Sequence, residues 1–249
     1  MKRIILLMVI AFCGLGLVLL AGCGGDGADK ATVVKIGKAP YDYEDPVLAV
    51  TRQIAVEQGY EVEVVEGDIG FMFLSLAQGD TDIWPGIWLP SIHGTYLSRY
   101  GDSFELGSAI FENAPLGWAV PQYVEVDSIA DLKGNEDVVN GKLYGLEPGC
   151  GMMLVSQEII DGYGLDLELI GGSLPSMMAE VDYAFKQHQP IAFLAWRPHT
   201  MFRNYKIKIL DDPEGYWAYD SEYWGIGEGF AEKAPDLYNF CKNFKMNIE

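Results

Sequence analysis

The sequence predicts an α/β fold in which mostly parallel sheets are flanked by helices. Short apolar runs such as Val33–Gly37 and Ile191–Ala195 alternate with longer amphipathic stretches along the chain. Strands that alternate with helices in this way form mainly parallel sheets covered on both faces. With 249 residues, of which 49% are hydrophobic, the chain is long enough to bury a large core in one or two domains.

Three strands are expected in the first third of the chain, at residues 33–37, 61–65 and 81–84. A helix between the first two begins at Asp45, the predicted N-cap, with Pro46 at the first helical position, and it ends at Gly59. A second helix covers residues 70–77 and stops at Gly79, because glycine adopts the left-handed conformation that ends helices.

The same alternation continues to the end of the apolar run at Ala195. A helix carrying His93 follows the third strand, and two further helices are expected from about Gly151 and over residues 175–187. The remaining strands are expected at residues 116–120, 142–146, near 167, and 191–195.

The N-terminus predicts export. Two basic residues, Lys2 and Arg3, precede an apolar run that ends in Leu20-Ala21-Gly22-Cys23, which resembles the lipobox of bacterial lipoproteins. Residues 1–22 are therefore predicted to be a lipoprotein signal peptide, with lipidated Cys23 opening a glycine-rich tether over 23–31. The alternative, a simple membrane-anchor helix, is weakened by the glycines at positions 14 and 16.

Composition excludes several classes of partner and cofactor. The formal charge of −19 argues against binding to nucleic acid or electrostatic adhesion to anionic lipid. The chain has three histidines and no close pair of them, so no metal site is predicted. Cys150 and Cys241 could pair, but two cysteines do not make a disulfide framework.

Two tryptophan segments, Trp88 to His93 and Trp196 to His199, each place an indole and an imidazole at the end of an expected strand. Aromatic faces attract cations, and an imidazole can donate a hydrogen bond to an anion. Two such segments meeting in one cleft would suit a quaternary ammonium carboxylate, whose cation cannot donate hydrogen bonds. The alternative is that these tryptophans only fill the core.

A glycine-rich segment, Leu146 to Gly151, follows one strand and opens a helix. Free backbone N–H groups at a helix N-terminus form an anion site. The segment lacks the lysine of a Walker loop and the spacing of a dinucleotide-binding turn, so a carboxylate is a better fit than a phosphate.

In these motifs the chain resembles the glycine betaine/proline betaine-binding proteins of osmoprotectant ABC importers, over nearly all of residues 33–246. The motifs that carry the resemblance are Val34–Gly37, Ala77–Asp82, Trp88–His93, Ser128–Leu132, Gly145–Gly151, Trp196–His199 and Asn243–Met246. Their shared order and spacing make the resemblance specific.

The resemblance implies a two-lobed clamshell, the type II periplasmic binding protein fold, with two chain crossings between the lobes. One lobe would take residues 32–119 plus 204–249 and the other residues 120–203. It implies a trimethylammonium group held in an aromatic cage and a carboxylate held by backbone amides and histidine.

Carried over residue by residue, the resemblance makes Trp88 and Trp196 cage walls. His93 would donate to the carboxylate, with the amides of Gly151 and Met152 as further partners. Four aromatic residues compete for the third wall, with Tyr41 and Trp224 favoured: Tyr41, Tyr43, Trp217 and Trp224.

The chain departs from the family pattern at two places. Some relatives have a tryptophan where this chain has Cys150, so this loop should supply no cage wall. Others carry a histidine near Tyr223 and Trp224 that contacts the carboxylate, and here it is absent. His199 is expected to bond a backbone carbonyl between the lobes rather than the ligand.

The resemblance predicts a monomeric binding protein without cofactor or enzymatic activity, working with an ABC permease and ATPase. Its lipid anchor would hold it on the extracytoplasmic side, in the periplasm or at the cell surface. Binding of choline, carnitine or another amine by the same fold remains an alternative. Two more distant ones are a metal-binding lipoprotein using His93 and His199, and an enzyme with Cys150 as nucleophile.

Overall fold

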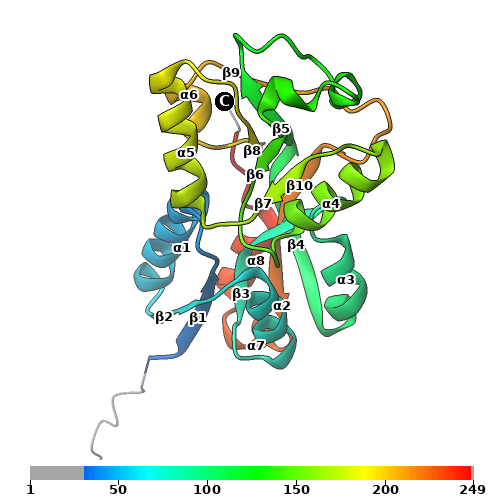
Figure 1. Cartoon of the computed structure of the whole chain (residues 1–249). Helices are drawn as coiled ribbons and strands as arrows, with labels where there is room; N and C mark the ends of the chain where they lie inside the picture. The colour runs from blue at the N-terminus through cyan, green and yellow to red at the C-terminus, as the bar shows by residue number, and fades with distance from the viewer. Residues whose placement is uncertain (1–30, 248–249) are drawn as a thin grey trace, which may run out of the picture. The chain divides into compact units, whose positions relative to one another are not determined.

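The computed structural model describes residues 31–247, and residues 32–249 form one compact unit. The predicted signal peptide and the lipidation site Cys23 lie outside the described residues. Two separate five-stranded sheets, each flanked by helices, confirm the predicted two-lobed α/β fold (Figure 1). Among the described residues, no helix is long and apolar enough to cross a membrane.

The first sheet has the strand order β2-β1-β3-β10-β4. Its strands are β1 (Val33–Lys38), β2 (Glu61–Glu66), β3 (Ile83–Leu89), β4 (Phe104–Ala114) and β10 (Asp220–Gly227). β1 pairs in parallel with β2 and β3, whereas β10 is antiparallel to both β3 and β4.

The second sheet has the order β7-β6-β8-β5-β9. Its strands are β5 (Leu116–Pro121), β6 (Lys142–Tyr144), β7 (Glu168–Ile170), β8 (Ala192–Trp196) and β9 (Ile207–Ile209). β6 is parallel to β7 and β8, and β5 is antiparallel to β8 and β9. Both sheets are therefore mixed rather than mostly parallel.

Helices lie on both sides of each sheet: α1 and α8 pack on one face of the first and α2 on the other, and α5 and α4 flank the second (Figure 1). The α-helices are α1 (Asp45–Glu57), α2 (Ile69–Gln78), α3 (Gly94–Tyr100), α4 (Gly151–Tyr163), α5 (Leu174–Gln187), α6 (Met201–Asn204), α7 (Phe230–Lys233) and α8 (Pro235–Asn243). Short 3-10 helices cover Asp42–Glu44, Gly101–Ser103, Ile129–Leu132 and Glu136–Val139.

Local signals explain most helix ends. The Asp68 carboxylate accepts from the Phe71 N–H at 2.8 Å and caps α2, which ends at Gly79 in the left-handed conformation, φ 75°. The predicted cap of α1 is wrong, because Asp45 is already helical and Glu44 precedes it as N-cap. The 3-10 turn Asp42–Glu44 runs directly into α1, so the chain is already turning before Asp45.

The second lobe is longer than predicted, by one strand at each of its two ends. β5 begins at Leu116 and β9 ends at Ile209, and both belong to the second sheet. The second lobe thus extends beyond the predicted 120–203. Periodicity identifies a strand but not the sheet it joins, since pairing between distant segments decides that.

Candidate functional site

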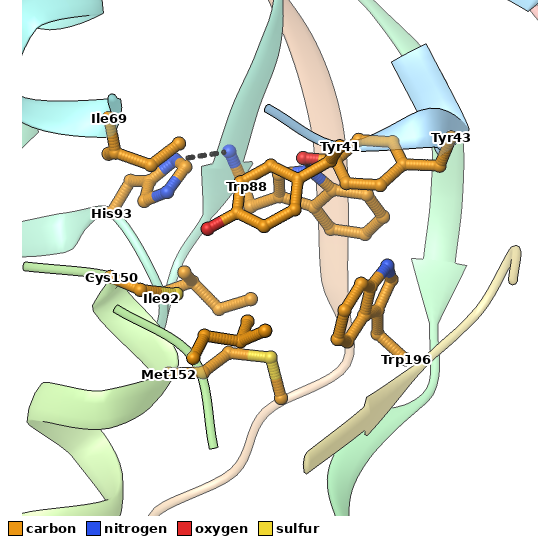
Figure 2. A pocket seen from close by; sticks show the side chains of 10 residues that line it. Tyr41, Tyr43, Ile69, Trp88, Ile92, His93, Cys150, Met152 and Trp196 are labelled. Atoms are coloured by element: carbon orange, nitrogen blue, oxygen red, sulfur yellow. Dashed lines mark hydrogen bonds between the residues drawn. The ribbon is translucent and has the colours of Figure 1, made fainter. Parts of the chain in front are cut away.

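A cavity with about 350 Å³ of empty space lies between the lobes (Figure 2). It sits where the chain leaves β1, β3 and β8 and where α4 begins. Its lining residues are Tyr41, Tyr43, Ile69, Trp88, Ile92, His93, Leu146, Cys150, Met152 and Trp196. This mainly aromatic and apolar lining, with a few polar groups, is typical of a small-molecule site.

Four aromatic side chains, Tyr41, Tyr43, Trp88 and Trp196, form what we call the aromatic box. The two tyrosine rings stack with centroids 5.6 Å apart, and Tyr43 meets the Trp88 ring edge-on at 5.6 Å. Trp196 approaches both tyrosines edge-on, at 6.2 and 6.3 Å (Figure 2). Several π-faces around one space attract a cation that offers no hydrogen-bond donors.

Hydrogen bonds fix the orientation of the box. The Trp88 indole N–H donates to the Tyr43 hydroxyl at 3.1 Å, and the Tyr41 hydroxyl donates to the Glu147 carboxylate on the other lobe. Burial raises the pKa of both tyrosine hydroxyls above the ordinary value, so they stay protonated. Because their partners hold them, the rings need little reordering when a ligand enters.

His93 lines the same cavity and supplies a neutral donor. Its Nδ1 accepts the Trp88 backbone N–H at 3.0 Å, drawn as a dashed line in Figure 2, which leaves the hydrogen on Nε2. Burial lowers the pKa of His93 to about 3, so the imidazole is uncharged at neutral pH. A neutral N–H next to the aromatic box suits a carboxylate without repelling the cation attached to it.

The loop that carries His93 is held by a buried carboxylate. Asp220, fully buried at the start of β10, accepts from the Ser91 N–H at 2.9 Å, the Ser91 hydroxyl at 2.7 Å and the Ile92 N–H at 2.9 Å. The His93 N–H closes the loop by donating to the Trp88 carbonyl at 2.9 Å. Trp88 and His93 are therefore positioned as one rigid unit.

The N-terminus of α4 forms the opposite wall. Its N-cap, Cys150, makes no side-chain capping bond, and Met152 lines the cavity. Among the described residues, Met153 is the first of the helix whose N–H bonds a backbone carbonyl, that of Cys150 at 3.0 Å. The amides of Gly151 and Met152 are thus positioned to meet an anion at the positive end of the helix dipole.

Gly151 is required by close approach of the two lobes. A Cβ at this position would stand 2.0 Å from the Ile92 carbonyl oxygen, which belongs to the first lobe. Any larger residue would push the lobes apart, so glycine here lets α4 reach the cavity.

Three contacts join the lobes around the cavity. Besides Tyr41 with Glu147, the Tyr96 hydroxyl donates to the Gly149 carbonyl at 2.9 Å. His199 Nε2 lies 3.5 Å from the Asp42 carboxylate. The expectation that His199 bonds a backbone carbonyl is wrong: its cross-lobe neighbour is a carboxylate, and its Nδ1 accepts the Met201 N–H at 3.1 Å.

Of the predicted site residues, the structure brings six to the cavity wall, namely Tyr41, Tyr43, Trp88, His93, Met152 and Trp196. Gly151 adjoins them as the first residue of α4.

Two predicted candidates, Trp217 and Trp224, lie elsewhere. Trp224 is fully buried against α8, with ring centroids 5.9 Å from Phe240 and 6.3 Å from Phe244. The pairing of β10 with β3 shifts register just there, at Tyr223/Gly225, so the alternation of faces is interrupted and Trp224 packs away from the cavity.

Trp217 lies in the connection before β10, where its backbone N–H donates to the Asp212 carboxylate at 2.8 Å, and it lines a different hollow. The third and fourth aromatic walls of the cavity are the two tyrosines. The favoured choice of Trp224 as a cage wall is therefore corrected.

Sequence reasoning missed four apolar lining residues: Ile69, Ile92, Leu146 and Cys150. Three of them, Ile92, Leu146 and Cys150, belong to the two segments that the sequence analysis had already selected. Their membership of those segments could have identified them as lining residues. Ile69, the first residue of α2, carries no such signal.

The structure opposes the reactive-thiol alternative. Cys150 is buried, and burial raises the pKa of its thiol to about 11. A nucleophilic cysteine needs a lowered thiol pKa, because the thiolate is the reactive form. Cys150 and Cys241 are both free thiols, and no group of three potential metal ligands occurs within residues 31–247.

The model of one protein family matches residues 32–249: the substrate-binding domain of ABC-type glycine betaine transport systems. The chain belongs to this family. A curated relative, the glycine betaine/carnitine transport binding protein GbuC of Listeria monocytogenes, is 31% identical over 148 residues, which are 58% of this chain. The match spans about half, 47%, of that relative's length.

Solved structures of the family have the same fold. The glycine betaine/L-proline-binding protein ProX of Borrelia burgdorferi matches with a TM-score of 0.83 and 29% identity, covering 86% of this chain and 82% of its own. Lactococcal OpuAC, closed around glycine betaine, matches with a TM-score of 0.82 and 29% identity, covering 87% and 85%. A choline-binding protein of an ABC transporter, at 22% identity, shares the fold.

Proposed function

We propose that this protein is the extracytoplasmic substrate-binding subunit of an ABC importer for glycine betaine or a closely related quaternary ammonium carboxylate. The aromatic box would hold the trimethylammonium group, and His93 with the first amides of α4 would hold the carboxylate. The ligand would lie between the lobes and stabilise their contact.

The observation that supports this proposal is the pairing of opposite chemistries in one cavity. Four aromatic side chains form one part of the wall, while a neutral imidazole and a helix N-terminus form another. Each desolvated π-face contributes about 0.5–2 kcal/mol toward a cation. A hydrogen bond to a charged group contributes about 1.5–3 kcal/mol, so both parts affect affinity.

A second candidate ligand is an amine without a carboxylate, such as choline. Among residues 31–247, no lysine or arginine lines the cavity, so in this proposal the anion is held by neutral donors. A ligand that lacks the carboxylate would lose those hydrogen bonds but would leave no charge of the protein unpaired. Carnitine, with its longer carbon chain, is a third candidate on the same grounds.

Family membership and the cross-lobe contacts support a permease and an ATPase as partners of the ligand-bound protein. In this proposal Cys23 carries the lipid that keeps the protein at the outer face of the membrane, and the protein acts as a monomer.

Titration of the purified protein with glycine betaine, proline betaine, choline and carnitine, followed by tryptophan fluorescence, tests the proposal. Saturable binding of the betaines with weaker binding of choline is expected. Tighter binding of choline would favour the second candidate, and no response to any of the four would refute the proposed function.

A further inference from the structure

Two buried carboxyl groups lie behind the aromatic box and take no part in lining the cavity. Glu222 on β10 is fully buried and directly opposite Trp88 in the register of β3 and β10. Opposed residues of an antiparallel pair extend from the same face of the sheet, so the Glu222 carboxyl lies beside the Trp88 indole. Glu44, 1% exposed, follows Tyr43 in the chain.

Few hydrogen bonds compensate these groups. Glu44 Oε2 accepts the Ala39 N–H at 2.9 Å and the Trp84 indole N–H at 3.4 Å. Its other oxygen and both oxygens of Glu222 have no partner among the described residues. Natural proteins rarely bury polar atoms in this way, and a buried carboxylate with neither a cation nor a donor is unfavourable.

The surroundings place the proton on Glu222. Burial, then the charge of Glu44, raises its pKa well above the ordinary value. Burial raises the pKa of Glu44 to about 8, against the Ala39 N–H and the Lys38 ammonium. Because Glu44 accepts two N–H groups and Glu222 accepts none among the described residues, Glu44 ionises more easily, and Glu222 keeps its proton while the box is empty.

Both carboxyls face Tyr43 closely enough to affect it. Their charges contribute to the raised pKa of the Tyr43 hydroxyl, which accepts the Trp88 indole N–H. Tyr43 and Trp88 are walls of the aromatic box. A cation in the box is thus separated from Glu222 by the side chains of those two residues.

We propose that Glu222 is a proton-linked countercharge for the cation: it is protonated when the aromatic box is empty and releases its proton to the solvent when a quaternary ammonium group enters. The resulting carboxylate attracts the cation from behind Tyr43 and Trp88. The inference rests on the proposed function, since it requires a permanently cationic ligand.

The direction of the pH dependence follows from proton release. The ligand-bound protein holds fewer protons than the free protein, so affinity rises with pH between the lowered pKa of bound Glu222 and its raised pKa in the free protein. Release of one proton on binding changes the affinity by at most about tenfold per pH unit. The groups facing the pair are Tyr43, Lys38, Asp45 and the Trp88 indole.

Isothermal titration calorimetry with glycine betaine, in buffers of different ionisation enthalpy, counts the protons released. We expect the native protein to release a measurable fraction of one proton at neutral pH and to bind at least about tenfold more tightly at pH 9 than at pH 6. Glu222→Gln should release fewer protons on binding and show a shallower pH profile, because only Glu44, with a pKa of about 8, still titrates behind the box. Glu228→Gln, which removes a charge from the exposed turn after β10, should behave like the native protein.

A neutral isostere separates charge from shape. In 3,3-dimethylbutyrate a carbon replaces the nitrogen of glycine betaine, so it should bind weakly and without proton release. Betaine binding with no proton release in the native protein, or an unchanged pH profile in Glu222→Gln, overturns the inference and leaves the proposed function standing. Absence of betaine binding overturns the proposed function itself.

Discussion

The aromatic and polar parts of the cavity wall are built in different ways. The aromatic box draws Tyr41, Tyr43 and Trp88 from the first lobe and only Trp196 from the second, and hydrogen bonds within and between lobes fix it. The polar part pairs His93 of the first lobe with the α4 N-terminus of the second, using neutral donors only. The cation site is thus largely preformed in one lobe, whereas the anion site is completed when the lobes meet.

The largest effect is expected from removing the aromatic wall of the second lobe. Trp196→Ala should weaken glycine betaine binding by about 30-fold or more, because a desolvated π-face that contributes about 2 kcal/mol is lost and water enters the box. Calorimetry measures the change. Trp217→Ala, a tryptophan outside the cavity, is the matched control and should stay within about twofold. Equal losses of affinity in the two variants would show that the tryptophan in the box matters no more for binding than one outside the cavity.

A methyl group at the lobe contact should have the next largest effect. Gly151→Ala forces a Cβ against the Ile92 carbonyl, and relieving such overpacking costs about 1–3 kcal/mol, or about fivefold or more in affinity. Gly149→Ala is the control, since nothing stands within 4 Å of its Cβ. Unchanged affinity in Gly151→Ala would show that the anion site does not need the observed contact.

His93 tests whether the two parts of the wall act separately. His93→Asn keeps an acceptor for the Trp88 N–H but loses the donor at Nε2, so betaine affinity should fall about tenfold while choline affinity stays level. His93→Gln can return a donor near Nε2 and should recover part of the loss. The betaine-to-choline affinity ratio measured by calorimetry decides, and a parallel loss for both ligands would contradict the assignment.

The smallest effect is expected from a hydrogen bond between the lobes. Tyr41→Phe keeps the ring in the box but removes the bond to Glu147, so affinity should fall about three- to tenfold. Tyr96→Phe, which removes the more exposed bond to the Gly149 carbonyl, should change it less. Equilibrium titration by tryptophan fluorescence measures both. A larger loss in Tyr96→Phe would reverse the expected order.

Sequence periodicity predicted several strands well, the antiparallel β5 among them, and missed three others, β4, β9 and β10. β1 and β2 are short alternating or apolar runs between turn signals, and their predicted bounds agree with the structure to within one residue. β4 and β10 contain glycines and buried or exposed acids, such as Glu222, and they form only because distant segments pair. The mixed character of both sheets follows from these unpredicted pairings.

The site could be predicted where a motif fixes the position of a side chain on a strand end. Trp88 lies one residue before the end of β3 and Trp196 is the last residue of β8, as expected from their segments. Trp224 could not be placed, because a register shift in β10 decides which face it takes. The buried Glu44 and Glu222 could not be foreseen either, since acidic residues are normally expected at the surface.

A crystal structure of the protein with glycine betaine tests the central claim most directly. The account predicts the trimethylammonium group between Tyr41, Tyr43, Trp88 and Trp196, and the carboxylate within hydrogen-bond distance of His93 Nε2 or the first amides of α4. A ligand bound in the reverse orientation, or outside this cavity, would contradict it.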